Sequence, residues 1–313
     1  MEYYRAMCPP APTLTEKNLP DQAGKVFIVT GANSGVGAEL AEILYAHNAT
    51  VYVAARSKEK ANFAIEKIKT AETTSSSTGK IAFLHLDLAD LTTIKASAEE
   101  FLAAESRLDV LWLNAGVMTP PQGSKTEQGH ELQLGTNNLG HFLFVKYLHE
   151  ILKRTTLAAP KNSVRVIWVS SSAAMMAPKP AIDFANMTYS KEESAMTKYA
   201  RSKAGNVLHA VEYAKRTAGE GILSLSLNPG NLKSGLQRHM SRTAAAVAGL
   251  LLYDPIFGAY TELYAGLSAE ISEEHNASFV APWGRVIKIR QDLWDPALTE
   301  KYWKWSEEQV KEY

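Results

Sequence analysis

The sequence predicts an α/β fold in which helices cover both faces of a doubly wound parallel sheet, within a single domain from about residue 24 to residue 295. The first observation is that short β-branched runs alternate with longer segments of helical period from Lys25 onwards. Such repeated strand-then-helix units imply parallel strands joined by right-handed crossovers. The second is that the strand segments are almost continuously apolar, as expected when both faces of a sheet are buried.

These two patterns place the elements in chain order. Strands are predicted at 25–30, 50–55, 80–86, 108–114, 163–170 and 222–228, with a further one at 277–283. Helices are predicted at 35–48, 58–70, 90–105 and 195–216, where apolar residues recur at helical spacing. The segment from 70 to 80 is rich in Thr, Ser and Gly and is predicted to be a polar loop. Residues 296–313 are predicted to form an amphipathic helix that covers a sheet edge or docks on another subunit.

Charge and composition exclude several classes of function. Lys plus Arg equals Asp plus Glu at 33 each, so the chain lacks the basic excess typical of nucleic-acid binding. Residues 1–23 contain four prolines and no apolar core, which favours an extended arm over a signal peptide. The longest small-apolar run, residues 244–252, is too short to span a membrane.

Cysteine and histidine are used sparingly. The single cysteine, Cys8, excludes an internal disulfide and any site built from several cysteines. The eight histidines show no metal-ligand spacing, so no metal site is expected. A chain with one cysteine fits a reducing compartment, and we expect a cytoplasmic protein.

The first predicted strand leads directly into TGANSGVG, a turn with three glycines that precedes a helix. Glycines here permit a tight turn and close approach of the backbone to a pyrophosphate, which would sit on free amides at the helix N-terminus. A glycine triplet alone is weak evidence, but its place between a strand and a helix is typical of dinucleotide binding. The predicted contacts at this turn are Gly31, Asn33, Ser34, Gly35, Val36 and Gly37.

The end of the second predicted strand, VAARSKEK, indicates which dinucleotide binds. At this position an acidic residue suits the ribose 2′-hydroxyl of NAD, whereas a cation suits the 2′-phosphate of NADP. Here Arg56 comes first, Lys58 follows, and no acid occurs before Glu59. An arginine can pair with phosphate through two hydrogen bonds, so we expect NADP(H). The alternative is that Arg56 only ends a strand in solvent.

The pentapeptide YARSK, residues 199–203, lies in the predicted helix 195–216. Positions i and i+4 share a helix face, so Tyr199 and Lys203 can point at one site, and the three residues between them are expected only to set this spacing. A tyrosine can protonate an alkoxide if its pKa falls from about 10 towards neutrality, and a nearby cation supplies much of that shift. From the pentapeptide alone, an ordinary amphipathic surface pair is the better interpretation.

Four motifs together resemble the short-chain dehydrogenase/reductase family of Rossmann-type oxidoreductases. TGANSGVG, LNAG at 113–116, VSSSA at 169–173 and YARSK follow one another in the family's order and spacing. The resemblance covers about residues 24–234. TNNLGHF, NPGNLKSGL and ELYAGLS are most similar to the retinol-dehydrogenase-like and WW-domain-oxidoreductase-like branch, which includes many fungal NADP-dependent reductases.

The resemblance implies a catalytic set of four residues. Tyr199 would be the general acid/base, and Lys203 would lower its pKa while bonding the nicotinamide ribose. Ser171, with Ser172 as the alternative, would hold the substrate carbonyl. Asn137 would orient Lys203 through a water molecule. The implied activity is the interconversion of a carbonyl and an alcohol with NADP(H).

The resemblance also implies cofactor contacts beyond the glycine turn. They are Asp87 and Leu88 at the adenine, Asn114, Ala115 and Gly116 along the adenosine, and Pro229, Gly230 and Ser234 beside the nicotinamide. Ser234 stands where the family often has threonine, and Asn138 where this branch often has histidine. His141 is expected to pack against the sheet rather than to act chemically.

Two segments are expected to border the substrate. Ser171 and Tyr199 are 28 residues apart, about twice the spacing in shorter members of the family, and this insert is expected to border the pocket. Residues 231–262 lie where the family builds its substrate lid. Apolar side chains in both segments favour a bulky, largely apolar small molecule such as a secondary-metabolite intermediate, although ordinary core packing is the alternative. The insert supplies Met175, Met176, Phe184 and Met187.

The sequence leaves two other functions open. The same fold could carry out non-redox or internally redox chemistry, such as epimerisation, dehydration or a pericyclic step. It could also serve as a non-catalytic NADP-binding regulator, although nothing in that role requires all four residues of the catalytic set. A homodimer or a homotetramer is open to the chain.

Overall fold

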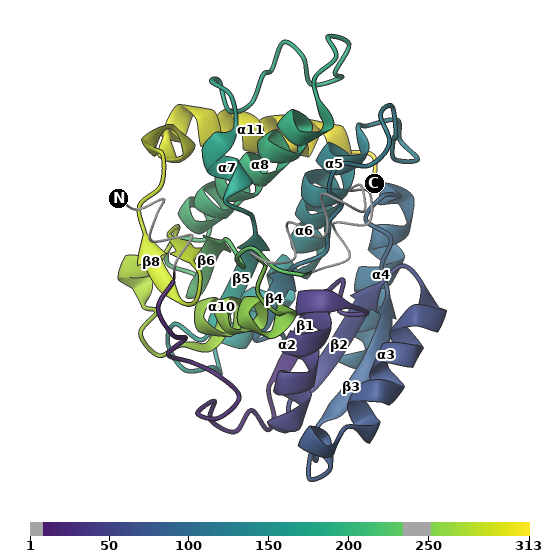
Figure 1. The fold of residues 1–313 in the computed structure, drawn as a ribbon, viewed down its shortest axis with the longest axis vertical. Helices are drawn as coiled ribbons and strands as arrows, with labels where there is room; N and C mark the ends of the chain where they lie inside the picture. The colour runs from purple at the N-terminus through teal and green to yellow at the C-terminus, as the bar shows by residue number, and fades with distance from the viewer. Residues whose placement is uncertain (1–8, 234–251) are drawn as a thin grey trace.

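An eight-stranded sheet forms the centre of the protein (Figure 1). The computed structural model describes residues 9–233 and 252–313. The strand order is β3-β2-β1-β4-β5-β6-β7-β8, and every pair is parallel except β7 and β8. The strands are β1 (Val26–Thr30), β2 (Thr50–Ala55), β3 (Lys80–His85), β4 (Val110–Leu113), β5 (Val164–Val169), β6 (Ile222–Leu227), β7 (Phe279–Ala281) and β8 (Arg285–Ile287). The predicted doubly wound α/β fold is confirmed.

Helices cover both faces of this sheet. One face carries α2 (Gly35–Ala46), α3 (Lys58–Thr70) and α10 (Pro255–Leu267). The other carries α4 (Leu91–Ala104), α6 (His141–Thr156) and α8 (Ala195–Arg216), with α11 (Pro296–Val310) packed against α8. Short helical segments are η1 (Glu72–Thr74), α5 (Leu132–Leu134), the π-helical turn η2 (Gly135–Gly140), α7 (Ala173–Met176), η4 (Glu273–His275) and η5 (Gln291–Trp294).

The far edge of the sheet differs from its prediction. The single strand expected at 277–283 is shorter, β7, and the chain turns at Gly284, whose φ is 101°. It then returns as β8, antiparallel to β7. The sequence does not predict β8 because its three residues are only half-buried and form no continuous apolar run.

The sheet order determines where a ligand can enter. β1 lies between β2 and β4, so the chain connections leave the centre of the sheet in opposite directions. At such a point the crossovers diverge and leave a crevice at the carboxyl ends of the strands. The loops that follow β1, β2, β4, β5 and β6 therefore meet at one edge of the sheet.

Both terminal segments pack onto the helices that cover the sheet. In residues 9–23, which form no helix or strand, Leu14 and Leu19 contact the core on the α2 side. At the other end, α11 buries Tyr302 and Trp303 against α8. The predicted C-terminal helix is present, and it covers α8 rather than a sheet edge.

The predicted lid, residues 231–262, is only partly described. Residues 234–251, which include Ser234, lie outside the described residues. The chain on either side is joined, since Lys233 N donates to Tyr253 O at 2.9 Å and Tyr253 N donates to Asn231 O at 2.9 Å. Helix α10 begins directly afterwards, so the two ends of the lid are fixed beside the sheet.

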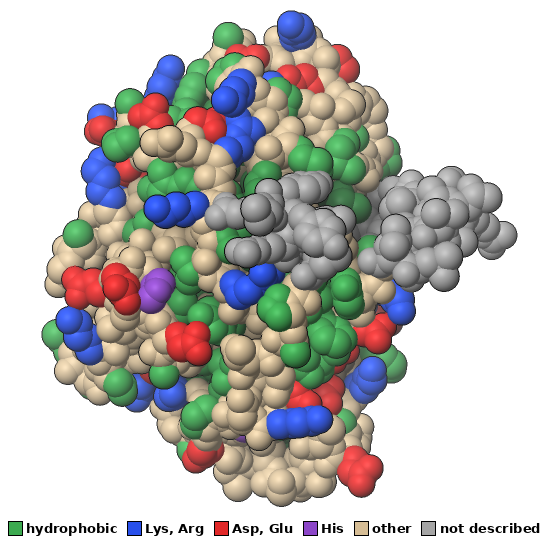
Figure 2. Space-filling view, turned by 60° about the vertical axis from the view of Figure 1, so that its left-hand side comes forward, with side chains coloured by type: hydrophobic (Ala, Val, Ile, Leu, Met, Phe, Trp, Pro, Cys, Tyr) green, Lys and Arg blue, Asp and Glu red, His purple; other side chains and the backbone are tan. Residues whose placement is uncertain are grey.

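The surface mixes charges of both signs. On the face in Figure 2, basic and acidic side chains are interspersed, and the described residues form no extended patch of one sign. None of the helices within 9–233 and 252–313 is long and apolar enough to cross a membrane. In the same part of the chain, no three His, Cys, Asp or Glu side chains are grouped as metal ligands would be.

Candidate active site

A cleft of about 580 Å³ lies at the carboxyl edge of the sheet. Most residues of the predicted site line it, and they are Gly31, Asn33, Ser34, Gly35, Val36, Arg56, Asp87, Leu88, Asn114, Ala115, Gly116, Ser171, Tyr199, Lys203, Pro229 and Gly230. Gly37, Lys58 and Asn137 do not line it, and Ser234 lies outside the described residues. The structure therefore brings both predicted ends of the site, cofactor and chemical, into one cleft.

The glycine turn after β1 depends on two of its glycines for shape. Gly31 and Gly35 have φ values of 73° and 57°, a region that favours glycine. A Cβ on Gly31 would lie 2.9 Å from the Cα of Ala115, so only glycine lets this turn approach the end of β4. A Cβ on Gly37 would lie 2.6 Å from Asn114 Nδ2, so Gly37 serves packing behind the cleft rather than its lining.

The end of β2 presents Arg56 to solvent at the rim of the cleft. Its side chain is 74% exposed, and its Nε lies 4.0 Å from Asp87 Oδ2. Asp87 Oδ1 accepts a hydrogen bond from Ala89 N at 2.9 Å, which fixes the carboxylate in the loop after β3. Lys58 is exposed on the first turn of α3, outside the cleft lining.

The loop after β4 is tied to the end of β1. Asn114 Nδ2 donates to Thr30 O at 2.8 Å, and Ala115 N donates to Thr30 Oγ1 at 2.9 Å. A Cβ on Gly116 would lie 3.1 Å from Asn137 Oδ1 and 3.5 Å from Lys203 Nζ. Gly116 therefore leaves room for an amide oxygen and an ammonium at the floor of the cleft.

Tyr199 lies on α8 with its phenol turned into the cleft. The side chain is only 6% exposed, and burial raises its pKa to about 12, although a hydrogen bond with the Ser171 hydroxyl acts in the opposite direction. The predicted alternative, Ser172, directly precedes α7 and does not line the cleft. Ser170 instead fixes α8, because its hydroxyl donates to Lys203 O at 2.6 Å.

Lys203 lies one turn further along α8, on the same face. Its Nζ donates to Val169 O at 2.9 Å and lies 5.7 Å from the centre of the Tyr199 ring. The side chain is 4% exposed, and burial lowers its pKa to about 8. An ammonium therefore lies beside the phenol, as the i, i+4 spacing predicts, but burial raises the pKa of Tyr199 instead of the expected lowering.

Asn137 is fully buried in η2 and joins the β4 loop to α8. Its Oδ1 accepts from Val117 N at 2.8 Å, and its Nδ2 donates to Val117 O and to Ser202 Oγ, both at 3.0 Å. Ser202 in turn donates to Tyr199 O at 2.8 Å. The Asn137 side chain thus ties the loop after β4 to the helix that carries Tyr199.

His141 on α6 packs against the sheet, as expected, and also makes two hydrogen bonds. Its Nε2 lies 3.0 Å from Thr30 Oγ1, and its Nδ1 lies 3.3 Å from Asn137 O. Burial lowers its pKa to about 3, so the ring is neutral. It does not line the cleft and acts as a spacer between β1 and η2.

The loop after β6 closes the cleft on the side away from Arg56. Gly230 has a φ of 106°, and a Cβ there would lie 2.6 Å from the Trp283 ring. Asn228, which the sequence did not single out, lines the cleft and accepts from Gly230 N at 3.2 Å. Positive φ and the close tryptophan together explain why glycine follows Pro229.

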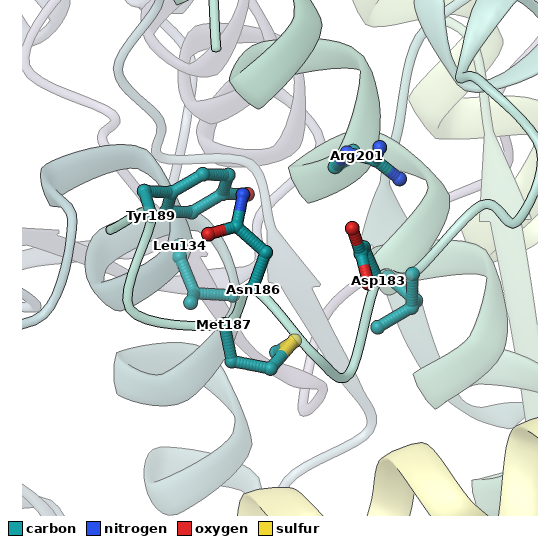
Figure 3. A pocket seen from close by; sticks show the side chains of 7 residues that line it. Leu134, Asp183, Asn186, Met187, Tyr189 and Arg201 are labelled. Atoms are coloured by element: carbon teal, nitrogen blue, oxygen red, sulfur yellow. The ribbon is translucent and has the colours of Figure 1, made fainter. Parts of the chain in front are cut away.

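The insert between β5 and α8 lies elsewhere than predicted. No described residue from 173 to 198 lines the cleft, and Met187 lines a separate small cavity with Asp183 and Arg201 (Figure 3). Arg201 makes a bidentate pair with Glu193, both distances being 2.7 Å, and donates to Pro180 O at 2.6 Å. This guanidinium holds the insert against α8, away from the cleft.

The expectation that the residues between Tyr199 and Lys203 only set their spacing therefore needs correction. Arg201 and Ser202 do more than set the spacing of the catalytic pair, because Arg201 anchors the insert and Ser202 binds Asn137. The sequence also missed Thr136, which lines the cleft with a buried hydroxyl that has no hydrogen-bond partner. Its position directly before Asn137 was the only signal available.

Known proteins match this chain along nearly its whole length. The family model for short chain dehydrogenase matches residues 25–245. Short-chain dehydrogenase/reductase pkfC of Emericella nidulans is 53% identical over 306 residues, which cover 96% of this chain and 97% of that protein. A short-chain dehydrogenase/reductase of Phomopsis amygdali is 50% identical over 319 residues, covering 97% of this chain and 95% of that protein.

A solved structure shares the fold. The crystal structure of an uncharacterized protein from Mycobacterium paratuberculosis superposes with a TM-score of 0.71 at 28% identity, covering 95% of this chain and 97% of that one. The family match and the fungal relatives agree with the motifs from the glycine turn to YARSK. The chain belongs to the short-chain dehydrogenase/reductase family of nicotinamide-dependent oxidoreductases and is similar to its fungal members.

Proposed function

We propose that the protein interconverts a carbonyl and an alcohol on a bulky, largely apolar small molecule, with NADP(H) as cofactor. The observation that carries this proposal is that Tyr199, hydrogen-bonded to Ser171, lines the same cleft as the glycine turn after β1. The reaction needs a proton donor, a second hydroxyl to hold the carbonyl, and a dinucleotide cradle at one place. All three meet here.

The glycine turn fits a dinucleotide. Ser34 precedes α2, and no side chain caps the first amides of that helix, which leaves them free for a pyrophosphate. Gly31 and Gly35 carry no side chain that would keep such a ligand away from the backbone of the turn. When bound, the nicotinamide supplies or accepts the hydride. The residues of this chain hold the cofactor, orient the substrate and move the proton.

Tyr199 is the residue that we propose moves the proton. Because its pKa is about 12, the phenol is protonated at neutral pH and can donate to a carbonyl oxygen during reduction. In the oxidation direction the phenol must lose this proton, and the positive charge of Lys203 favours that loss. The Ser171 hydroxyl, bonded to the phenol, lies where it can hold the same substrate oxygen.

Arg56 supports the choice of NADP(H). It lies at the end of β2 on the rim of the cleft, and its ion pair with Asp87 is long and largely exposed. Exposed pairs of this kind are weak, so the guanidinium remains available to a phosphate. We therefore assign the 2′-phosphate of the cofactor to Arg56.

The apolar part of the lining supports a bulky, apolar substrate. Away from the predicted cofactor contacts, it includes Val117, Met118, Pro120, Pro121, Leu132, Leu232 and Leu252. The insert methionines do not contribute, so this support comes from the β4 loop and the lid ends. We test it with 9,10-phenanthrenequinone against glyceraldehyde, and reduction of glyceraldehyde alone would remove this part of the proposal.

The proposed chemistry predicts a separation of turnover from binding in Tyr199→Phe. Loss of the hydroxyl removes the proton donor, so consumption of NADPH with 9,10-phenanthrenequinone should fall by about 100-fold or more. The apolar ring remains, so NADPH binding, measured by fluorescence titration, should stay within about twofold. Tyr213→Phe is the control. Tyr213 lies on α8 like Tyr199, but its hydroxyl pairs with His149 of α6 and neither residue lines the cleft.

The same assay separates the two rival functions. A non-catalytic regulator would bind NADPH and consume none with any carbonyl or alcohol. Non-redox or internally redox chemistry would convert a substrate without net change in NADPH. Wild-type turnover that survives Tyr199→Phe would contradict our assignment of the proton donor.

We further propose a cytoplasmic, homo-oligomeric protein. A homodimer and a homotetramer differ twofold in mass, which light scattering after size exclusion distinguishes directly. A monomer in that measurement would refute the oligomer.

A further inference from the structure

Two donors on α8 share one main-chain carbonyl at the end of β5. The Val169 oxygen accepts from Lys203 Nζ and from Asn206 Nδ2, both at 2.9 Å. Lys203 is 4% exposed and Asn206 is 1% exposed. A carbonyl oxygen has two lone pairs, so these two bonds fill it.

A second amide holds Asn206 in this orientation. Its Oδ1 accepts from Asn138 Nδ2 at 2.5 Å, and Asn138 Nδ2 also donates to Ser202 O at 2.8 Å. Because the Val169 oxygen can only accept, the Asn206 amide nitrogen must face it. Neither amide can turn without leaving a buried polar group unpaired, which is unfavourable. The direction of the Asn206 donor is therefore fixed.

The two donors differ in their access to ligands. Lys203 lines the cleft and Asn206 does not, so Asn206 binds the Val169 oxygen from inside the protein. Without this amide, the oxygen would offer a second lone pair to the ammonium on the buried side. Lys203 would then settle deeper, away from the cleft. With the amide present, the carbonyl also stays satisfied if the ammonium turns towards a ligand.

We propose that Asn206 is a positioning residue for Lys203, holding its ammonium at the cleft by occupying the buried side of the Val169 carbonyl. The inference rests on the proposed function, in which the cleft that Lys203 lines holds NADP(H). Asn138 supports Asn206 in this role, and Ser202 anchors Asn138.

The charges around Lys203 determine how a change at position 206 would act. Within residues 9–233 and 252–313, the titratable groups beside Lys203 are Tyr199 on α8, His141 on α6 and Glu262 on α10. His141 is neutral, and Glu262 raises the pKa of Lys203 against the larger effect of burial. A carboxylate at position 206 would add a negative charge beside the ammonium and raise the Lys203 pKa further.

Two variants of nearly equal side-chain size test this role. Asn206→Leu removes the donor, and we expect it to weaken NADPH binding by about tenfold in a fluorescence titration, because the ammonium recedes from the cleft. Asn206→Asp replaces the donor by an acceptor, and we expect the Lys203 pKa to rise by about one unit. That pKa is measured without cofactor, from the pH dependence of Lys203 acetylation by acetic anhydride, read by mass spectrometry.

The control is Thr299→Val. It removes a buried hydrogen bond from Thr299 Oγ1 of α11 to Glu212 Oε2, and Glu212 lies on α8 like Asn206. It should lower the melting temperature and leave both NADPH binding and Lys203 labelling unchanged. If the Asn206 variants behave like this control, the positioning role is wrong. The Asp variant keeps the shape of the amide and decides the matter if the Leu variant does not fold.

The experiment separates this inference from the proposed function. If Tyr199→Phe retains turnover while the Asn206 variants still alter NADPH binding and Lys203 labelling, the function fails and the positioning role stands. If Tyr199→Phe loses turnover and both Asn206 variants bind and label like the wild type, only the positioning role fails.

Discussion

Arg56 is the residue on which the choice of cofactor depends. It follows a strand whose end faces the cleft, and among the described residues its guanidinium is held only by a 4.0 Å contact with Asp87. A guanidinium with few fixed partners can turn to a phosphate at little cost. A carboxylate at the same place would instead repel a phosphate and accept a bond from a ribose hydroxyl.

Arg56→Asp should therefore reverse the cofactor preference. We expect the ratio of kcat/KM for NADPH over NADH to fall by about 100-fold, equivalent to about 3 kcal/mol of charge-assisted hydrogen bonding. The measurement is steady-state reduction of 9,10-phenanthrenequinone with each cofactor. Lys58→Ala is the control, since Lys58 lies outside the cleft lining. An unchanged ratio in Arg56→Asp would refute the assignment.

At the same scale, the sequence reveals some site residues and hides others. Tyr199, Lys203 and the glycine turn belong to patterns with fixed spacing, and spacing survives in a sequence. Asn206 and Thr136 belong to no such pattern, because an asparagine inside a helix and a threonine before Asn137 look like ordinary polar residues. Their roles follow from the carbonyl and the cleft that they face, which only the fold brings near.

The insert between β5 and α8 shows what one buried arginine can do for an element. Arg201 is 7% exposed and binds Glu193 and two insert carbonyls, those of Pro180 and Ala181. The sequence favoured an insert at the pocket because Ser171 and Tyr199 are 28 residues apart, about twice the spacing in shorter members of the family. The structure differs because the planar guanidinium of Arg201, with several donors in fixed directions, binds two parts of the insert at once and holds it against α8.

Removing this guanidinium should release the insert. Arg201→Leu leaves Glu193 and the two carbonyls without their buried partner, and we expect a loss of about 3 kcal/mol in the free energy of unfolding. Limited proteolysis followed by mass spectrometry should show cleavage between residues 178 and 193 before any other site. Lys304→Met, which removes an exposed pair with Glu300, should cost under about 1 kcal/mol. First cleavage outside the insert would contradict this account.

The helices predicted between residues 35 and 216 are present with ends within two residues, whereas α6 and α10 were not predicted. Helix α8 runs from Ala195 to Arg216, as predicted, because Ser194 caps its first turn and its apolar period is regular. The sequence did not predict β8, because its three half-buried residues carry no such signal.

For the whole molecule, the parallel direction of the central strands follows from the sequence, because strand-then-helix units and continuous apolar runs predict it. β5 and β6 are buried along their entire length, which agrees with their prediction as strands covered on both faces. What the sequence does not show is which polar groups this burial isolates. Glu262 on α10 is the clearest case, since it is fully buried and neither carboxylate oxygen has a hydrogen-bond partner.

Glu262 should make the stability of the whole protein fall as pH rises. Burial raises its pKa from 4.5 to about 8, with Lys203 opposing the shift, so between these values the unfolded chain ionises and the folded chain stays protonated. Its contribution to stability is complete below pH 4.5 and is lost as pH rises through about 8, by up to about 1.4 kcal/mol per pH unit.

Glu262→Gln removes this titration. Urea unfolding at pH 5, 6.5 and 8 should show the variant gaining stability over the wild type as pH rises. Glu308→Gln, an exposed change on α11, should give curves parallel to the wild type. Parallel curves for Glu262→Gln would show that the carboxyl is not protonated in the folded protein.

The packing of α11 on α8 also has a consequence for how the protein is made. His209 stacks on Tyr302 and lies 2.9 Å from Ser306 Oγ, although His209 and Ser306 are 97 residues apart in the chain. A ribosome completes α8 long before it completes the helix that covers it. Until then the aromatic and histidine side chains on that face of α8 lack their α11 partners, so the helix that carries Tyr199 reaches its native packing only after residues 296–310 have been made.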